Sequence, residues 1–383
     1  MKNVLIIGGG LAGLTAAIHL SRSGLRVTLV EKNHYPKHKV CGEYISNEIL
    51  PYYEWLGLDI GSLHPAKIST LHFSSAKGKT IGCRLPLGGF GVSRFTLDRY
   101  LSEKATAAGA NRITATVEEV TFHNDTFTAL LDNGTRLHAD IVIGAHGKRS
   151  AFDIRMSREF VSKKSPWLAV KSHYKGHFPK EVVGLYNFDG GYCGVSNVES
   201  GIINICYLAG YYSFKQYKSP TEYERNVLGK NPQLKRILEQ ATPLFEKQLT
   251  ISQISFASKD CVENHILMAG DAAGLIHPLC GNGMAMAIHS AKIASECILE
   301  FCRNPQFSRA DMEMAYTQAW KKNFSKRLKT GKALAKVLQN GYLSAVLMQC
   351  AFWFPMVLPF IIRKTHGKVL TVSTHVPEYQ IPV

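Results

Sequence analysis

Three glycines near the N-terminus have the spacing of a phosphate-binding turn. Gly8, Gly10 and Gly13 form the pattern G-x-G-x-x-G between an apolar run at residues 4–7 and a run of small residues typical of a packed helix. The first glycine permits the bend, the second lets the backbone approach a pyrophosphate, and the third allows close helix–strand packing. The N–H groups at the start of the helix then face the phosphates with about half a positive charge.

An acidic residue stands where this turn needs one. Glu31 ends a second expected strand at residues 26–30, where a carboxylate can accept hydrogen bonds from both hydroxyls of an adenosine ribose. Lys32 follows it and is included among the expected cofactor-binding residues. The strand, turn, helix and acid together predict a site for a dinucleotide, and they leave NAD and FAD as alternatives.

The elements that position this turn belong to a chain of 383 residues, which suggests two domains and an appendage. Apolar residues make up 45% of it, as in a globular protein. The nine cysteines are scattered and include no C-x-x-C pair, so we expect a reducing cytoplasm, no disulfide framework and no metal site. The N-terminus runs directly into a strand, unlike a secretory signal.

The formal net charge of +16 is unevenly distributed. No acidic residue occurs between Glu313 and Glu378, and basic residues gather in one stretch of this interval: Lys321, Lys322, Lys326, Arg327, Lys329, Lys332 and Lys336. No nucleic-acid-binding motif accompanies them, so the stretch favours a solvated or interfacial helix, and nucleic acid is not an expected partner.

A second glycine-rich segment carries a family resemblance. "GDAAGLIHPLCGNGMAMAIHSAKIASE", from Gly270, resembles the second FAD motif of the para-hydroxybenzoate hydroxylase-like flavoproteins. The resemblance implies that Asp271 holds the ribityl chain of FAD. It also implies that backbone N–H groups reach the flavin ring from four consecutive residues, Gly281, Asn282, Gly283 and Met284. "VSRFTLDRYLSEKA" is similar to the family's arginine segment, in which Arg94 would contact the cofactor and Arg99 is the competing candidate.

Two further segments refine this resemblance. "GAHGKRS" has His146 where the family has an aspartate, and we expect a turn histidine satisfied by backbone hydrogen bonds rather than a proton-transfer residue. "KVCGEYIS" resembles the geranylgeranyl reductase group within the superfamily. The aromatic–Trp–Phe–Pro motif of those reductases and the Trp-x-Trp-x-Ile-Pro motif of flavin halogenases are both missing, which disfavours halogenation and weakens isoprenoid reduction.

The expected fold class is α/β, with a Rossmann-type FAD-binding domain, a second antiparallel β-sheet substrate domain and a helical C-terminal segment. Short strand patterns between Trp167 and Leu208 give the second sheet, to which residues 70–87 add strands. The FAD-binding domain is expected to be discontinuous, over residues 1–66, 94–155 and 257–310. Residues 67–93 and 156–256 then form the substrate domain, and residues 311–383 form the C-terminal segment.

No pattern of residues identifies a catalytic group, so the catalytic residues stay unknown. The pocket candidates are Cys41, Tyr192, Cys193 and Pro278. Glycines beside Tyr192 and Cys193 would let a ligand approach, although ordinary positions in the sheet core are the alternative. Cys41 has no partner in the sequence that would make it a nucleophile or a ligand. Lining the pocket, influencing product or proton delivery, and plain packing stay open for it.

The segment Ala345–Ile362 is apolar and uncharged, and Pro355 and Pro359 are expected to break its helix. Three interpretations stay open: a lid or tunnel wall over a lipid-like substrate, a peripheral contact with a membrane, and a transmembrane helix. The first two imply a long or apolar substrate. They are compatible with a cytoplasmic protein that associates with a membrane.

The sequence thus predicts an FAD-dependent oxidoreductase that takes electrons from NAD(P)H. A monooxygenase that hydroxylates an apolar aromatic or polyketide-like substrate is the preferred reaction, since it needs no protein nucleophile. A reductase that saturates isoprenoid or lipid double bonds is the alternative. A flavoprotein that passes electrons to a membrane quinone is the third hypothesis.

Overall fold

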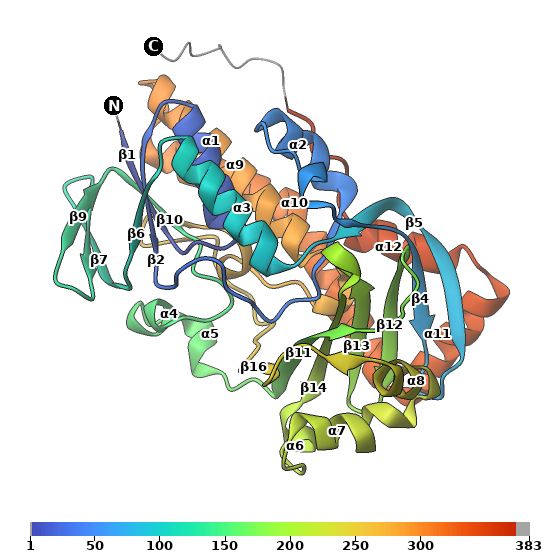
Figure 1. Cartoon of the computed structure of the whole chain (residues 1–383). Coiled ribbons are helices and arrows are strands. Elements are labelled where there is room, and N and C mark those ends of the chain that lie inside the picture. The colour runs from blue at the N-terminus through green and yellow to red at the C-terminus, as the bar shows by residue number, and fades with distance from the viewer. Residues whose placement is uncertain (1, 373–383) are drawn as a thin grey trace.

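A buried apolar strand, β1 (Asn3–Ile7), lies inside the first sheet of the computed structural model, which describes residues 2–372 (Figure 1). It pairs in parallel with β2 (Arg26–Glu31) on one side and β10 (Ile141–Gly144) on the other. The order of the six strands is β17-β18-β10-β1-β2-β6, and only the β17–β18 pair is antiparallel. The bounds of the outer strands are β6 (Asn111–Thr114), β17 (Val262–Glu263) and β18 (Ile266–Met268).

One helix layer covers this sheet. Helix α1 (Leu11–Arg22) lies between α3 (Arg94–Ala107) and α9 (Gly283–Arg303), and the three run side by side in Figure 1. Small residues of α1 allow this close packing, since Ala16 and Ala17 are fully buried. A separate antiparallel sheet adds Phe127 and Leu131 to the same core. It consists of β7 (Val117–His123), β8 (Thr126–Leu131) and β9 (Arg136–Ala139).

The second sheet has nine strands in the order β15-β11-β14-β13-β12-β4-β5-β3, with β16 paired to β11. All its pairs are antiparallel except β4 with β12. The bounds are β3 (Tyr44–Ser46), β4 (Ala66–Ser74), β5 (Thr80–Gly91), β11 (Trp167–Lys175), β12 (Val182–Phe188), β13 (Gly191–Asn197), β14 (Ile203–Gly210), β15 (Thr242–Pro243) and β16 (Leu249–Ser252). The predicted α/β fold with a second sheet is therefore confirmed.

Short helices complete both domains. Tyr223 of α7 and Leu234 of α8 are fully buried against Tyr207 of the second sheet, so one face of that sheet is covered by these helices. The short helices are α2 (Leu50–Trp55), α4 (Ala151–Arg155), α5 (Glu159–Ser162), α6 (Tyr211–Phe214), α7 (Pro220–Asn226) and α8 (Pro232–Gln240).

The basic stretch forms one face of α10 (Arg309–Gln339). A capping box between Ser308 and Asp311 starts this helix. Its buried residues recur every three or four positions, as an amphipathic helix requires: Met312, Tyr316, Trp320, Phe324, Arg327, Gly331 and Ala335. The six lysines of the stretch are exposed on the remaining surface, as predicted for a solvated helix.

The apolar C-terminal segment forms two helices, α11 (Gly341–Trp353) and α12 (Val357–Thr365). No single described helix is long and apolar enough to cross a membrane; α11 and α12 meet that criterion only as a pair bent by 115°. Pro355 lies in the break, as predicted. The prediction for Pro359 was wrong, because it occupies the first turn of α12, where its missing N–H group would have no helical partner.

Candidate active site

The glycine turn between β1 and α1 has the geometry that its sequence predicts. Gly8 has φ +103°, and a Cβ atom there would lie 2.5 Å from the carbonyl oxygen of Ala145. A Cβ on Gly13 would lie 1.9 Å from the Gly8 oxygen, so only glycine lets α1 pack on the turn. Gly10 differs, because a Cβ there meets nothing closer than Arg94 Nη2 at 3.9 Å. The second glycine therefore faces open space rather than protein.

Glu31 and Arg94 border this open space from opposite sides. Glu31 Oε2 accepts a 2.7 Å hydrogen bond from the N–H group of Gly9, which holds the carboxylate at the turn. The other oxygen accepts bonds from the backbone and side-chain nitrogens of Asn33. Lys32 is exposed at the rim. The carboxylate that could hold a ribose is thus fixed at the end of β2.

The carboxylate of Asp98, one turn further along α3, holds the side chain of Arg94. The Nε and Nη2 atoms of Arg94 donate to Asp98 at 2.7 and 2.8 Å, and Lys39 Nζ lies 2.8 Å from the same carboxylate. Burial alone would raise the pKa of Asp98, but the positive charges of Arg94 and Lys39 outweigh it and lower that pKa. Arg99, the competing candidate, is exposed and pairs with Glu103. Only the first of the two arginines reaches the cavity.

The second glycine-rich segment approaches the same space from α9. Gly281 has φ +62°, and no side chain caps the first turn of α9, so its N–H groups stay free. Gly283 and Met284 line the cavity, but Asn282 does not. The amide of Asn282 donates instead to Glu48 at 3.1 Å. This side-chain contact ties the turn to Glu48, and the contact predicted for the backbone N–H group of Asn282 stays a prediction.

Asp271 lines the cavity near this helix start. Within residues 2–372 its carboxylate has no hydrogen-bond or ion-pair partner, so it is available to a ligand hydroxyl. Lys259 positions the loop by donating to the carbonyl oxygens of Lys148 and Asp271, each at 2.7 Å. Burial lowers the pKa of Lys259 to about 8. No sequence pattern indicated this lysine, since its partners are backbone atoms of distant loops.

The glycine turn, Glu31, Arg94, Asp271 and the start of α9 all line one cavity of about 460 Å³, which continues from the glycine turn into an apolar chamber. We call this part the lipid chamber, and two walls form it. The wall from the second sheet consists of Leu71, Phe73, Leu85, Val183, Leu185, Tyr192 and Leu208. The wall from α10, α11 and α12 consists of Leu334, Leu338, Leu347, Leu358, Ile361 and Ile362, with the polar Thr365 and His366 at the end of α12. A ligand can therefore extend from the nucleotide end between these walls without meeting a charged side chain of the chamber lining.

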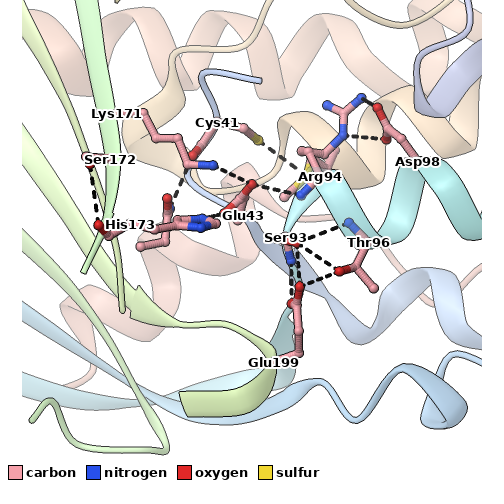
Figure 2. Close-up of polar contacts among 12 residues, drawn as sticks. Cys41, Glu43, Ser93, Arg94, Thr96, Asp98, Lys171, Ser172, His173 and Glu199 are labelled. Carbon is pink, nitrogen blue, oxygen red and sulfur yellow. Dashed lines mark hydrogen bonds and ion pairs between the residues drawn. The ribbon is translucent and has the colours of Figure 1, made fainter. Parts of the chain in front are cut away.

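A buried charged cluster lies beside the cavity and centres on Glu43, as Figure 2 shows. Glu43 Oε1 accepts hydrogen bonds from Lys171 Nζ and the Arg94 N–H group, both at 2.8 Å. Its Oε2 atom lies 2.7 Å from His173 Nε2. Burial would raise the pKa of Glu43, but the hydrogen bond from His173 and the charge of Lys171 overcome this and lower it. The cluster thus ties residue 43 to both domains.

Sequence reasoning missed this cluster, although a signal was present. Lys171 and His173 are two residues apart in the buried part of β11, so both side chains project from the same face. Charged residues on a buried strand face need a partner of opposite charge. Glu43, two residues after Cys41, was the carboxylate to consider.

Two of the predicted pocket candidates, Tyr192 and Cys193, lie on opposite faces of β13. Tyr192 lines the cavity, and so do Cys41 and Pro278. Cys41 Sγ lies 3.5 Å from Met284 Sδ, at the start of α9. The prediction for Cys193 needs correction, because alternation along the strand directs its thiol to the opposite face, into the core beneath α7 and α8. Tyr186, its cross-strand partner, lies in the same core.

His146 also differs from expectation. Its Nε2 atom lies 2.9 Å from Asp153 Oδ1, and Arg158 Nη1 lies 3.0 Å from the same oxygen. A side-chain carboxylate therefore holds Nε2, rather than backbone groups, and the buried Nδ1 atom has no hydrogen-bond partner within the described residues. Burial would raise the pKa of Asp153, but the hydrogen bonds from His146 and Arg158 lower it. His146 borders the cavity, so this pairing fixes the ring at the edge of the site.

Comparison with known proteins decides which dinucleotide this geometry serves. The family described as the FAD binding domain matches residues 1–304. The chain belongs to this family of FAD-dependent oxidoreductases. The predicted membership of the para-hydroxybenzoate hydroxylase-like flavoproteins is thereby confirmed, with FAD as the cofactor.

Proteins similar to this flavoprotein are described as catalysts of different reactions. A digeranylgeranylglycerophospholipid reductase from Methanosarcina acetivorans is 25% identical over 345 residues, which cover 83% of this chain and 80% of the relative. A geranylgeranyl diphosphate reductase from Rhodobacter capsulatus is 26% identical over 361 residues, which cover 89% and 84%. The solved structure of a flavin-dependent brominase is 17% identical, with a TM-score of 0.77 over 95% of this chain and 94% of its own, and shares the fold. The fold alone does not select the reaction.

The residues present fit FAD. The open backbone at Gly10, the free N–H groups of α9 and the unpartnered carboxylate of Asp271 face one cavity, at separate points along it. We expect the pyrophosphate at Gly10, the adenosine ribose at Glu31, the ribityl chain at Asp271 and the flavin ring at Gly283 and Met284. When bound, FAD supplies two-electron redox chemistry at the mouth of the lipid chamber.

Substituting Gly10→Ala is expected to weaken FAD binding at least about tenfold without destabilising the apoprotein. The added methyl group meets no protein atom closer than 3.9 Å, but it occupies the space that the pyrophosphate needs. FAD titration and urea unfolding of the apoprotein measure the two effects. Gly210→Ala is the matched control, since Gly210 also precedes a helix in an extended conformation. Unchanged FAD affinity in Gly10→Ala would contradict this placement of the cofactor.

Proposed function

We propose that this flavoprotein reduces a carbon–carbon double bond in a long isoprenoid-like lipid, with NAD(P)H as electron donor. The observation that carries the proposal is the lipid chamber, which begins at the expected position of the flavin and is walled by apolar side chains from two domains. Hydroxylation of an aromatic ring, the reaction preferred from the sequence, would call for polar groups at the substrate end to orient the ring substituents. The chamber lining favours a chain-like substrate instead.

The names of the two sequence relatives support the same substrate class. One is described as a reductase of a digeranylgeranyl phospholipid and the other as a reductase of geranylgeranyl diphosphate. Both descriptions combine reduction with a long unsaturated chain, which matches an elongated apolar chamber. Saturating one double bond adds a hydride equivalent to one carbon and a proton to its neighbour, so the product gains two hydrogens and no oxygen.

The chain's own residues would orient the substrate and exclude water. Leu185 packs in three apolar clusters, which place it at the junction of the sheet wall and the C-terminal helices. Asn204 Nδ2 donates to the carbonyl oxygen of Cys41 at 3.2 Å, and Lys171 and His173 hold Glu43 two residues later, where the chamber meets the expected flavin position. Rigid walls of this kind hold an alkene against the cofactor without a protein nucleophile.

Product mass after anaerobic turnover tests the proposal. Purified holoenzyme, NADPH and a geranylgeranyl ether lipid are expected to give a product with two added hydrogens whether or not oxygen is present. A product that gains oxygen, and forms only in air, would establish the monooxygenase instead. NADPH oxidation that requires an added quinone and leaves the lipid unchanged would establish electron transfer.

A chamber variant sharpens this test. Leu185→Trp narrows the junction of the walls, so kcat/KM should fall at least about tenfold for a chain of four isoprene units. It should fall much less for a single isoprene unit. Ile154→Trp, at an exposed position of α4, is the control and should leave both values unchanged. Equal losses for the two chain lengths would contradict binding of the chain in this chamber.

A further inference from the structure

The hairpin of α11 and α12 carries a set of exposed large apolar side chains, which we call the hairpin patch. Its members, with their exposed fractions, are Tyr342 (78%), Leu343 (44%), Val346 (43%), Phe352 (53%), Trp353 (67%), Phe354 (66%), Met356 (69%) and Phe360 (61%). They follow one another along α11, the turn and α12, at the edge of the molecule beside β5 (Figure 1). An exposed apolar patch of this size marks a site of contact with another protein or with a membrane.

The opposite faces of the two helices are part of the protein core. Met348 and Ala351 of α11 pack with Phe73 of β4, while Leu358 and Ile362 of α12 line the lipid chamber. Helix α11 is therefore apolar on its inner and outer sides. A helix that is apolar all round is normally buried completely, and the described chain buries only one side of this one. The inner faces of α11 and α12 contact the protein core and the chamber, whereas the outer faces carry the exposed side chains of the hairpin patch.

The charges around the hairpin patch are all positive. Lys79 Nζ lies 4.3 Å from the ring centre of Phe352, and Lys364 Nζ lies 5.3 Å from that of Phe360. Lys336 precedes the hairpin and Arg363 lies within it, while the sequence has no acidic residue from position 314 to 377. A second copy of this chain would bring one cationic rim against another, which costs energy. Anionic lipid headgroups complement the rim, and acyl chains complement the aromatic residues within it.

We infer that the hairpin patch docks this protein on the surface of an anionic lipid bilayer, and that the lipid substrate enters the chamber beneath the same hairpin. The docking surface is independent of the reaction. The entry route rests on the proposed function, because it needs a membrane lipid as substrate. Trp353 and Tyr342 then lie at headgroup level, where amphipathic rings are favoured. The α11–α12 pair lies on the bilayer and forms the cover between it and the chamber.

Vesicle sedimentation of the full-length holoenzyme tests the docking surface. The protein should sediment with phosphatidylcholine vesicles that contain phosphatidylglycerol, and less with phosphatidylcholine alone. Raising the salt concentration should weaken the binding, because the cationic rim is exposed. The triple variant Trp353→Ser, Phe354→Ser and Met356→Ser should reduce the partition coefficient at least about tenfold. Tyr212→Ser, which removes an aromatic side chain of 77% exposure from α6, should leave it unchanged.

Three results would overturn the inference. The first is a wild-type protein that does not sediment with anionic vesicles. The second is a triple variant that binds as well as the wild type. The third is a dimer in light scattering that the triple variant dissociates, since this would assign the hairpin patch to a second copy. An unchanged melting temperature of the triple variant checks that its fold is intact.

Activity in two settings separates the entry route from the reaction. The triple variant should turn over a geranylgeranyl lipid in vesicles at least about tenfold more slowly than the wild type, and a short detergent-dispersed prenyl lipid at the same rate. If the triple variant and the wild type turn over the lipid in vesicles at the same rate, the entry route is contradicted. Vesicle binding without turnover of either lipid by the wild type would contradict the proposed function and leave the docking surface standing.

Discussion

Replacing Glu43 with glutamine is expected to lower the free energy of unfolding by about 3–5 kcal/mol. Lys171, its ion-pair partner at 2.8 Å, is completely buried, so the variant leaves a positive charge in the interior without its counterion. Glutamine keeps nearly the same shape, which limits the effect to charge. Urea unfolding at neutral pH, monitored by tryptophan fluorescence, measures the change at fixed FAD concentration.

Two further variants serve as the control and as the rescue for the Glu43→Gln experiment. Glu103→Gln removes an exposed carboxylate from the pair with Arg99 and should leave the stability unchanged. Combining Glu43→Leu with Lys171→Met replaces the buried pair by apolar side chains and should recover most of the lost stability. A Glu43→Gln variant as stable as the wild type would show that Lys171 reaches solvent or another anion.

The two dinucleotide-binding segments could be predicted because their chemistry is local. The glycine turn, the following helix and Glu31 lie within 24 residues of one another, from Gly8 to Glu31, and their conformations depend on contacts that the sequence order fixes. Gly8 and Gly13 have the tight packing that their spacing predicts. Asp271 came instead from the resemblance of its segment to the second FAD motif, and it lies in a short turn, Gly270–Ala272, at the same cavity. Short-range geometry is what sequence patterns encode best.

The Glu43 cluster could not be predicted with the same certainty because its partners are distant. Lys171 and His173 follow Glu43 by 128 and 130 residues, and only the packing of the second sheet against the FAD-binding part brings them together. Glu43 also has φ +53°, a left-handed conformation that is unusual for a residue other than glycine. The sequence drew attention to Cys41, whereas the structure shows the more extensive contacts at its neighbour.

The error over Cys193 has a different physical cause. Strand β13 is buried on both sides, by the cavity on one face and by α7 and α8 on the other. Its sequence therefore lacks the alternation of polar and apolar residues that would distinguish the faces. Tyr192 and Cys193 were equivalent candidates until the register of the sheet was known. The hairpin of α11 and α12 shows the same limit, since composition predicts its apolar character but not which side faces the chamber.

Lowering the pH from 7 to 5 is expected to reduce the free energy of unfolding by about 2 kcal/mol for each of three buried histidines. Burial lowers the pKa of His19 and His289 to about 3 and that of His277 to about 4. Below pH 6.5 the unfolded chain takes up protons at these positions while the folded protein does not. Stability is therefore complete above pH 6.5 and is lost as the pH falls toward the folded values.

One buried carboxylate titrates in the same pH range as the histidines: burial raises the pKa of Glu224 to about 7, so its protonation stabilises the folded protein as the pH falls and offsets about 2 kcal/mol of the loss. Three other buried carboxylates titrate below this range. The pKa values of Glu43, Asp98 and Asp153 are also lowered, but stability linked to them is present above their unfolded values of 4.5 and 3.8 and declines only below these. Urea unfolding at pH 7, 6 and 5 measures the slope. His19→Gln, which can keep a hydrogen bond to Tyr52, should reduce the loss of stability between pH 7 and 5 by about 2 kcal/mol, since one protonation site is removed.

An exposed histidine provides the control for this pH dependence. His177→Gln, on the surface after β11, should leave the slope as it is in the wild type. If His19→Gln has the same slope between pH 7 and 5 as the wild type, His19 must reach solvent in the folded state. That outcome would require an opening of the core around α1 and α9, because His19 and His289 are buried within these two helices. Both helices adjoin the expected FAD site, so such an opening would also weaken cofactor retention at acidic pH.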